Sequence, residues 1–232
     1  MATTLKTGAL IPSKAPNLPI GPVDYSQQYQ DQFTNVLRLY FNQIDNFASG
    51  VSGTNGGSYL KFPFIAASDS ASQYATATNT ATIVLWDNLS NGSGFTLNAN
   101  STATAEFSGI YKITYSLQFA NNDNAIHDAT VWLRSNGSNT ACDINNSATI
   151  FTLQARKSAL LPNYVCGYSE VVFPLNAGDN VGLWWGTNQA ATANAAVQGI
   201  YIYSQPVETT PMAHPAVPSA IGSITFVSAL ST

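Results

Sequence analysis

The side chains that could perform acid–base chemistry are few in this 232-residue chain. Hydrolysis of a glycosidic bond needs two carboxylates that flank the bond, about 5 Å or about 6.5–9.5 Å apart. The segment 59–204 carries eight carboxylates, and most stand next to Asn, Gly or Ser, where an acidic side chain usually forms a turn. They are Asp69, Asp87, Glu106, Asp123, Asp128, Asp143, Glu170 and Asp179. A polysaccharide-degrading enzyme is therefore the least favoured function that we consider.

The two histidines, His127 and His214, belong to no motif for nucleophilic catalysis. The sequence holds no G-x-S-x-G motif and no Cys–His signature, although it has two cysteines, Cys142 and Cys166. We expect His127 to make local hydrogen bonds at a strand edge and His214 to be exposed. Synthesis in a cytosol favours two free, partly buried thiols over a disulfide. We predict that the chain is not an enzyme.

Oxygen-rich segments raise the possibilities of metal binding and sugar binding. Residues 121–124 (Asn-Asn-Asp-Asn) with Asp128 offer ligands that calcium prefers, but the EF-hand spacing is missing, and zinc would need more Cys and His. We therefore predict no metal and no other cofactor. Sugar recognition needs only exposed aromatic side chains among Asn, Thr and Gln, which the predicted loops supply. Those loops are 92–95, 121–127, 136–146 and 187–194, and solvated, variable loops are the alternative.

Charged residues make up 9% of the chain, against about 25% in an average soluble domain. The formal net charge is -4 and the eight Lys and Arg residues are scattered, so the clustered cations that nucleic acid requires are missing. No run of about 18 apolar residues could span a membrane, and the first ten residues do not resemble a secretion signal. These features predict neither a nucleic acid nor a membrane as partner.

Residues 1–23 predict an extended arm. Prolines recur every three or four residues from Pro12 to Pro22, which excludes a helix and favours extended backbone. The arm also carries aliphatic side chains that a solvated linker would not need. The main ones are Leu10, Ile11, Leu18 and Ile20. We interpret the segment as an anchoring arm that docks on another protein, with a floppy tail as the alternative.

Residues 24–47 predict one amphipathic α-helix with Asp24 as its N-cap. Five apolar residues at heptad spacing form a seam along one side. They are Phe33, Leu37, Tyr40, Ile44 and Phe47. Such a seam favours self-association or docking, although a single helix packed on its own β domain is the alternative. A Gly/Ser-rich linker at 48–58 then marks a domain boundary.

From residue 59 to about 204 the pattern changes to the alternation typical of strands. The clearest case is 110–120, where the odd positions are apolar and the even ones polar. Nine further strands are expected at 61–67, 81–87, 94–97, 102–107, 129–135, 149–154, 164–175, 181–186 and 196–204, with turns at 91–92, 136–137 and 177–179. Many short strands without a helix among them predict a mainly β protein, a β-sandwich.

Three of these strands are apolar on both faces, at 83–86, 183–185 and 200–203. A sandwich strand needs only one apolar face, so the surplus indicates a subunit interface. The segment 205–232 is rich in proline and ends in an apolar run at 221–230. We interpret it as a C-terminal tail whose apolar run is either a terminal strand or a second docking segment.

Two short stretches resemble jelly rolls of the tumour-necrosis-factor and complement globular-head type. Residues 105–115 are similar to the F-x-x-G-x-Y signature through Phe107, Gly109 and Tyr111, with one residue fewer between the Phe and the Gly, and residues 175–183 are similar to L-x-x-G-D-x-V-x-L. The resemblance implies a ten-stranded jelly roll over about 60–204 that packs into a tight trimer through aromatic residues. The candidates for that trimer interface are Tyr111, Tyr115, Phe119, Trp185, Tyr201 and Tyr203.

The segments 10–20 and 36–46 resemble the start of virion structural proteins of tailed phages that infect marine bacteria and cyanobacteria. This resemblance implies an attachment module before a variable appendage domain. Together the features predict a virion structural protein, made in the bacterial cytoplasm as a homotrimeric fibre or appendage. Residues 1–47 would anchor it to other virion proteins, and its jelly roll would bind host-surface glycan. A capsid decoration or cement protein is the alternative.

Overall fold

The computed structural model describes residues 14–52, 62–159, 161–194, 196–210 and 212–230. The chain forms two units, Met1–Lys61 and Phe62–Thr232, which are described separately below. The first contains one long helix and the second contains all of the described strands. The predicted jelly-roll β-sandwich preceded by an arm and a helix is confirmed as the fold class.

Helix α1 spans Gln27–Ser52, so it begins and ends later than the predicted 24–47. The Ser26 Oγ accepts a hydrogen bond from the Tyr29 backbone N–H at 3.3 Å, which makes Ser26 and not Asp24 the N-cap. The helix continues into the predicted linker because Val51 extends the apolar spacing of Ile44 and Phe47. The rest of that linker lies outside the described residues. No described helix is long and apolar enough to cross a membrane.

The described part of the arm, residues 14–23, is free of helix, as its prolines predict. The Tyr29 hydroxyl donates a hydrogen bond to the Pro19 carbonyl oxygen at 3.3 Å, which ties the arm to the first turn of α1. Leu18 and Ile20 are exposed, the latter almost completely. Leu10 and Ile11 lie outside the described residues.

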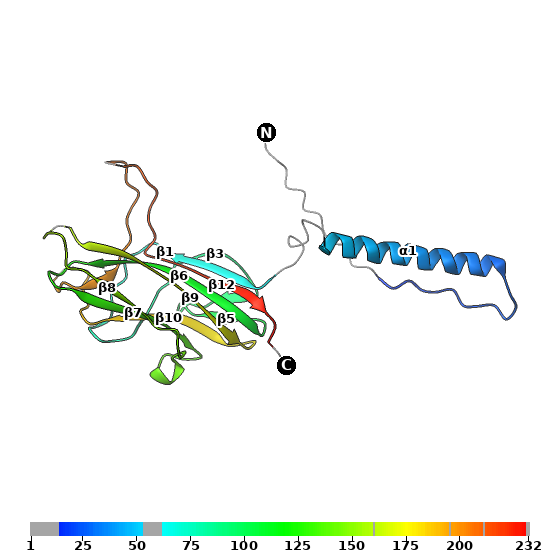
Figure 1. Ribbon diagram of the computed structural model, residues 1–232, viewed down its shortest axis with the longest axis horizontal. Helices are drawn as coiled ribbons and strands as arrows, with labels where there is room; N and C mark the ends of the chain where they lie inside the picture. Colours follow the sequence, from blue (N-terminus) through cyan, green and yellow to red (C-terminus); the bar gives the residue numbers. More distant parts are fainter. Residues whose placement is uncertain (1–13, 53–61, 160, 195, 211, 231–232) are drawn as a thin grey trace. The chain divides into compact units, whose positions relative to one another are not determined.

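Residues 62–230 fold into two antiparallel sheets that pack face to face (Figure 1). Sheet A contains β1 (Phe64–Asp69), β3 (Asn88–Ser93), β6 (Gly109–Asn121), β9 (Asn163–Leu175), β11 (Ile200–Ile202) and β12 (Ala220–Ser228). Sheet B contains β2 (Thr82–Ile83), β4 (Phe95–Leu97), β5 (Ala103–Ala105), β7 (His127–Ser135), β8 (Thr149–Leu153) and β10 (Asn180–Thr187). All ten predicted strand segments contain a strand, although 81–87 and 196–204 form only short ones.

The long strand β6 organises sheet A. It pairs along one side with β9, and along the other with β12 and β11 placed end to end. The odd residues of β6 from 111 to 119 are buried and the even ones are partly exposed, as the alternation predicts. Pro174 does not break β9, because β9 is an edge strand and a proline there interrupts no second ladder.

Two sequence-based expectations about sheet A are wrong. The predicted turn at Asn91-Gly92 lies inside β3, and the chain turns two residues later, at Gly94 with φ +73. The predicted boundary at residue 204 separates β12 from the sandwich, yet β12 pairs with both β1 and β6 in the middle of sheet A. The proline-rich segment is therefore an insertion before the last strand, bridged by Gln205–Val217 and Glu208–His214. The apolar run after it forms β12, so the terminal-strand alternative is confirmed and the docking-segment alternative is wrong.

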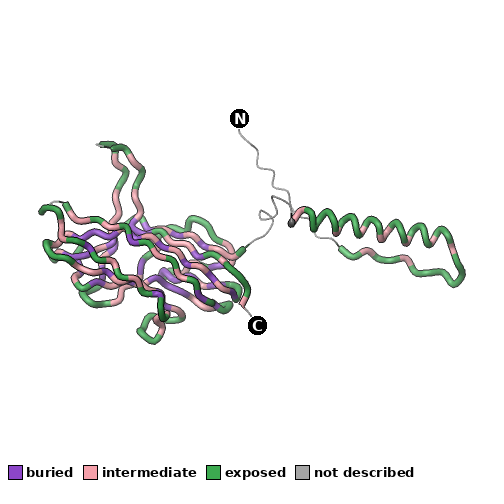
Figure 2. The backbone as a smooth tube through the Cα atoms, viewed as in Figure 1, coloured by how far each residue is buried: buried purple, intermediate pink, exposed green. Residues whose placement is uncertain are grey.

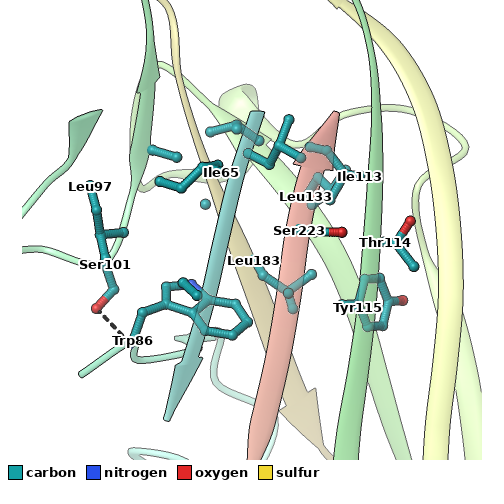
Figure 3. A pocket seen from close by; sticks show the side chains of 16 residues that line it. Ile65, Trp86, Leu97, Ser101, Ile113, Thr114, Tyr115, Leu133, Leu183 and Ser223 are labelled. Atoms are coloured by element: carbon teal, nitrogen blue, oxygen red, sulfur yellow. Dashed lines mark hydrogen bonds between the residues drawn. The ribbon is translucent and has the colours of Figure 1, made fainter. Parts of the chain in front are cut away.

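The buried residues lie on both sheets and form one hydrophobic layer between them (Figure 2). A void of about 50 Å³ remains inside this layer, lined mainly by apolar side chains such as Ile65, Leu133 and Leu183 (Figure 3). Trp86 borders the void, and its backbone N–H donates to the Ser101 Oγ at 3.1 Å. Sites for small molecules usually enclose about 300 Å³ or more, so this void is a packing defect in the core.

Candidate functional site

Four of the six predicted trimer-interface residues lie inside the subunit. Tyr111, Tyr115, Phe119 and Trp185 are each at most 1% exposed. The Phe119 and Trp185 rings meet across the sandwich, with centroids 6.0 Å apart. The prediction is wrong for these four residues, because the odd positions of β6 and the position of Trp185 in β10 face the opposite sheet. Only Tyr201 and Tyr203 lie on an outer face.

Two of the three strands that looked apolar on both faces are partly covered by the chain itself, whereas Leu85 in the third is 50% exposed. The guanidinium carbon of Arg134 lies 4.4 Å from the Trp184 ring centre, so a cation covers the outer side of that strand. Tyr201 stacks on Tyr74 with ring centroids 5.2 Å apart. These strands therefore do not by themselves indicate a subunit interface.

Exposed apolar side chains gather instead on the side of sheet A that faces away from sheet B, here called the outer face of sheet A. Its edge strand β9 and its central strand β12 contribute large side chains that are each about half exposed. They are Tyr164 (50%), Tyr168 (58%), Val172 (55%), Ile221 (50%) and Val227 (54%). Such a set on one sheet face is more than the scattered apolar residues of an ordinary surface.

The strand register fixes how these residues lie. Tyr168, Ser116 and Ile221 share one row across β9, β6 and β12. The next row holds Glu170, Thr114 and Ser223. Small side chains thus fill the centre of the face and large ones flank it, which leaves the centre open to close approach. A third row holds Val172, Lys112 and Thr225, and the Lys112 Nζ pairs with the Glu170 Oε2 of the second row at 3.8 Å.

Four tyrosines form a connected group at one end of this face. Tyr164 and Tyr203 lie 5.0 Å apart between ring centroids, and Tyr203 contacts Tyr201, which stacks on Tyr74. Burial, followed by the neighbouring tyrosines, raises the pKa of Tyr201 to about 12. The Tyr201 phenol therefore stays neutral at physiological pH, and the group presents aromatic surface at this end of the face.

The helix seam residues Phe33, Leu37, Tyr40 and Ile44 are half-exposed in the first unit, and Phe47 is 39% exposed. Outside the seam, Leu39 and Phe41 are more exposed, at 52% and 57%. Self-association or docking through this helix stays a prediction, and so does the role of the arm.

The acidic and histidine side chains are engaged in local contacts. The His127 Nε2 lies 2.7 Å from the Asp123 Oδ2, and this hydrogen bond is the main cause that lowers the pKa of Asp123. His214 lies 3.8 Å from Glu208 in the proline-rich insertion. Both cysteines are free thiols, as predicted; Cys142 is partly buried, but Cys166 is exposed on β9, against the prediction.

The possible calcium ligands do not converge. The Asn121 amide donates to the carbonyls of Ala125 and Gln154, and its Oδ1 accepts from the Asp123 backbone N–H. Its polar atoms thus hold the loop together. Within the described ranges, no group of three or more His, Cys, Asp or Glu side chains is arranged to hold a metal.

A groove of about 290 Å³ lies on the outer side of sheet B. It is lined by the loop 79–81, by the ends of β7 and β10, and by Asn188. Of the loops expected to bind sugar, only 187–194 contributes to it. The alternation in β7 could have identified its main aromatic residue, because Trp132 stands between the inward-facing Val131 and Leu133.

No family model matches the sequence, and no curated protein matches it. Among solved structures, the chain is similar to Eiger TNF from S. frugiperda, with a TM-score of 0.43 and 13% identity over 73% of this chain and 96% of that chain. This likeness is too low to carry an argument. The class of protein is therefore defined by its own strand pairing, as a two-sheet antiparallel jelly-roll sandwich.

Proposed function

We propose that this protein is a phage virion structural protein that acts by binding and not by catalysis. It is a homotrimer whose subunits meet through the outer face of sheet A. Residues 1–47 anchor it to other virion proteins, and the jelly roll is displayed for contact with host-surface glycan. On the virion, the trimer forms a fibre or an appendage.

The proposal of a trimer rests on the exposed apolar side chains on the outer face of sheet A. Interfaces are enriched in tyrosine, and this face carries Tyr164 and Tyr168; the two charges in its central rows, Lys112 and Glu170, pair with each other at 3.8 Å. Its flat centre of Ser116, Thr114 and Ser223 would let a neighbouring subunit approach closely. A lone subunit would instead leave Tyr164, Tyr168 and Val172 in water.

The anchoring role is supported by the apolar side chains of the first unit. Leu18 and Ile20 in the arm and Phe41 in α1 are at least half exposed. The helix carries few charges to solvate it, since its 26 residues include only Asp31, Arg38 and Asp45. A partner surface that covers these side chains would stabilise both arm and helix.

The two free cysteines test the proposed interface in the native full-length protein. In a lone subunit, exposed Cys166 should react with iodoacetamide faster than half-exposed Cys142. In the trimer we expect the reverse order, because Cys166 lies on the outer face of sheet A between Tyr164 and Tyr168. Mass spectrometry of the two peptides measures the rates, and sedimentation velocity of the same sample measures the oligomer.

Dilution or mild denaturant that separates the subunits should restore the faster reaction of Cys166, which serves as the internal control. A monomer at micromolar concentration would refute the trimer. A trimer in which Cys166 still reacts first would refute this face as the interface while leaving the oligomer in place.

The location on the virion is a separate prediction. We expect immunogold particles directed against this chain to label appendages of purified phage particles. Label spread over the capsid shell would instead establish the decoration or cement role, which keeps the same fold. A virion preparation that contains none of this chain by mass spectrometry would contradict both.

A further inference from the structure

The groove on sheet B combines one aromatic ring with several uncommitted polar groups. The β7 and β10 register places Thr130 directly opposite Gly186, and Trp132 opposite Trp184. Gly186 therefore forms a low floor beside the Trp132 ring. A side chain there would begin 3.3 Å from the Thr80 carbonyl oxygen and 3.6 Å from Trp132 Cη2, so glycine keeps this space open.

The Trp132 ring is held in place by contacts outside the groove. Its Nε1–H donates to the Asp143 Oδ1 at 2.7 Å, and the Arg134 guanidinium carbon lies 5.5 Å from its ring centre. The opposite, benzo end of the indole borders the groove floor. A ring fixed before the ligand arrives loses little entropy on binding.

The polar groups around the ring are also fixed. Asn188 Oδ1 accepts a hydrogen bond from the Asp128 backbone N–H at 3.0 Å, which leaves the Asn188 Nδ2 as a donor. The Asp128 Oδ1 accepts from the Thr152 hydroxyl at 2.6 Å. Among the described residues, nothing bonds the Asp128 Oδ2, the Thr130 hydroxyl or the Asn79 side-chain amide.

The wall opposite β7 is tied to the sheet. The backbone N–H of Asn79, a residue with φ +58, donates to the Thr187 carbonyl at 2.8 Å. The Thr78 hydroxyl accepts a hydrogen bond from the Ala190 backbone N–H at 3.1 Å. The loop therefore stands as a fixed side of the groove, and its Thr80 carbonyl lies beside the floor.

From this arrangement we infer that the Trp132 groove binds a neutral pyranose unit of a surface polysaccharide. A pyranose has an apolar C–H face that packs on an indole, and hydroxyls that pair with a carboxylate acceptor and an amide donor set side by side. Asp128 and Asn188 supply such a pair. The Asp128 carboxylate would repel a uronic acid, and the -4 net charge has the same effect, so the ligand class is neutral. This inference rests on the glycan-binding part of the proposed function and assigns its site.

Saturation-transfer NMR on the full-length protein tests the site. The probes are oligosaccharides of glucose, galactose, mannose and N-acetylglucosamine, with trigalacturonate as the anionic member. We expect at least one neutral probe to bind at concentrations up to about 10 mM, and trigalacturonate not to bind. If only the uronate binds, or no neutral probe does, the inference is wrong.

Two variants place the binding in the groove. Thr130→Phe should abolish sugar binding, because the added ring covers Gly186. The variant should still fold, since an aromatic side chain opposite a strand glycine is tolerated in a sheet. Asp128→Ala should weaken binding about tenfold by removing a charged acceptor. Asp87→Ala is the matched control, since Asp87 is an exposed carboxylate that accepts from Ser70 and is not part of the groove lining, and it should leave affinity unchanged.

Binding that survives Thr130→Phe would overturn the groove assignment. Sedimentation velocity of each variant separates this failure from that of the proposed function, because all three variants should remain trimeric. Loss of binding together with loss of the trimer in Thr130→Phe would count against the inference, since the groove lies on the other sheet from the proposed interface.

Discussion

Tyr168→Glu is expected to dissociate the trimer while leaving the subunit folded. Tyr168 is 58% exposed in the lone chain, so the glutamate would stay hydrated in a monomer. In the trimer it would be buried in each of the subunits and would stand two residues from Glu170 on the same face of β9. A buried, unpaired carboxylate beside a like charge costs about 2–5 kcal/mol, which raises the subunit dissociation constant by about two orders of magnitude or more.

Ile150→Glu is the matched control. Ile150 is 66% exposed, lies on β8, the edge strand of the other sheet, and faces away from the core. Both variants replace an exposed apolar residue on an edge strand by glutamate, so the cost in strand propensity is the same within a few tenths of a kcal/mol. Sedimentation velocity over a dilution series should show monomer for Tyr168→Glu and trimer for Ile150→Glu.

Circular dichroism of both variants should match that of the parent protein, which checks that dissociation is not unfolding. If the Tyr168→Glu variant remains a trimer at the concentration at which the parent protein is a trimer, the outer face of sheet A is not the subunit interface. Dissociation by Ile150→Glu alone would move the interface to sheet B.

Alternation in the sequence predicted which residues of β6 share a face, but it could not say which face another subunit covers. The odd positions of β6, including Tyr111 and Tyr115, are the more hydrophobic set, and they form the core and not the trimer interface that the family resemblance implies. The residues left outside, such as Tyr168 and Val172, sit in a strand whose two faces differ little in hydropathy. Only the pairing of β9 with β6 reveals that they line one surface.

Two further errors came from residues whose local preference was overridden by pairing. Asn91-Gly92 has the composition of a turn, yet hydrogen bonds to β1 hold it in β3. The prolines after residue 205 indicate an irregular tail, and they do form an excursion, but the chain returns and places β12 between β1 and β6. The apolar run at 221–230 is consistent with a terminal strand, but a local pattern does not say which strands it pairs with.

Only part of the groove could be predicted from the sequence. An outward-facing tryptophan in a strand whose neighbours face the core is a signal of a functional or covered side chain, and Trp132 gave that signal. The contribution of Asn79 and Thr80 could not be foreseen, because they come from a loop about fifty residues away that the β10 pairing brings alongside.

The cluster that holds Trp132 predicts the largest single loss of folding stability. Arg134 is 4% exposed, lies between the Trp132 and Trp184 rings, and its Nε donates to the Asp143 Oδ1 at 2.5 Å. Asp143→Ala would leave this guanidinium buried with the Ser138 carbonyl as its one remaining oxygen partner among the described residues. Removing one partner of a buried pair costs about 3–5 kcal/mol, and the 35% exposure of Asp143 lowers the expected loss to about 2–4 kcal/mol.

Urea denaturation followed by tryptophan fluorescence measures this loss in the sandwich alone, since all four tryptophans lie in residues 62–232. Each variant has to be compared at one subunit concentration, because association adds to the apparent stability. Asp87→Ala is the control: it removes an exposed carboxylate that accepts hydrogen bonds from Ser70 but neutralises no buried cation, and it should cost less than about 1 kcal/mol.

The double variant Arg134→Met with Asp143→Ala separates charge burial from packing. Methionine can fill the space between the two indole rings and makes favourable sulfur–aromatic contacts, so removing the cation as well should restore part of the stability that Asp143→Ala loses. The double variant is therefore expected to unfold at a higher urea concentration than the single Asp143→Ala variant. If instead the double variant unfolds at a lower urea concentration than Asp143→Ala, Arg134 stabilises the cluster through its packing between the rings, and its charge does not need Asp143.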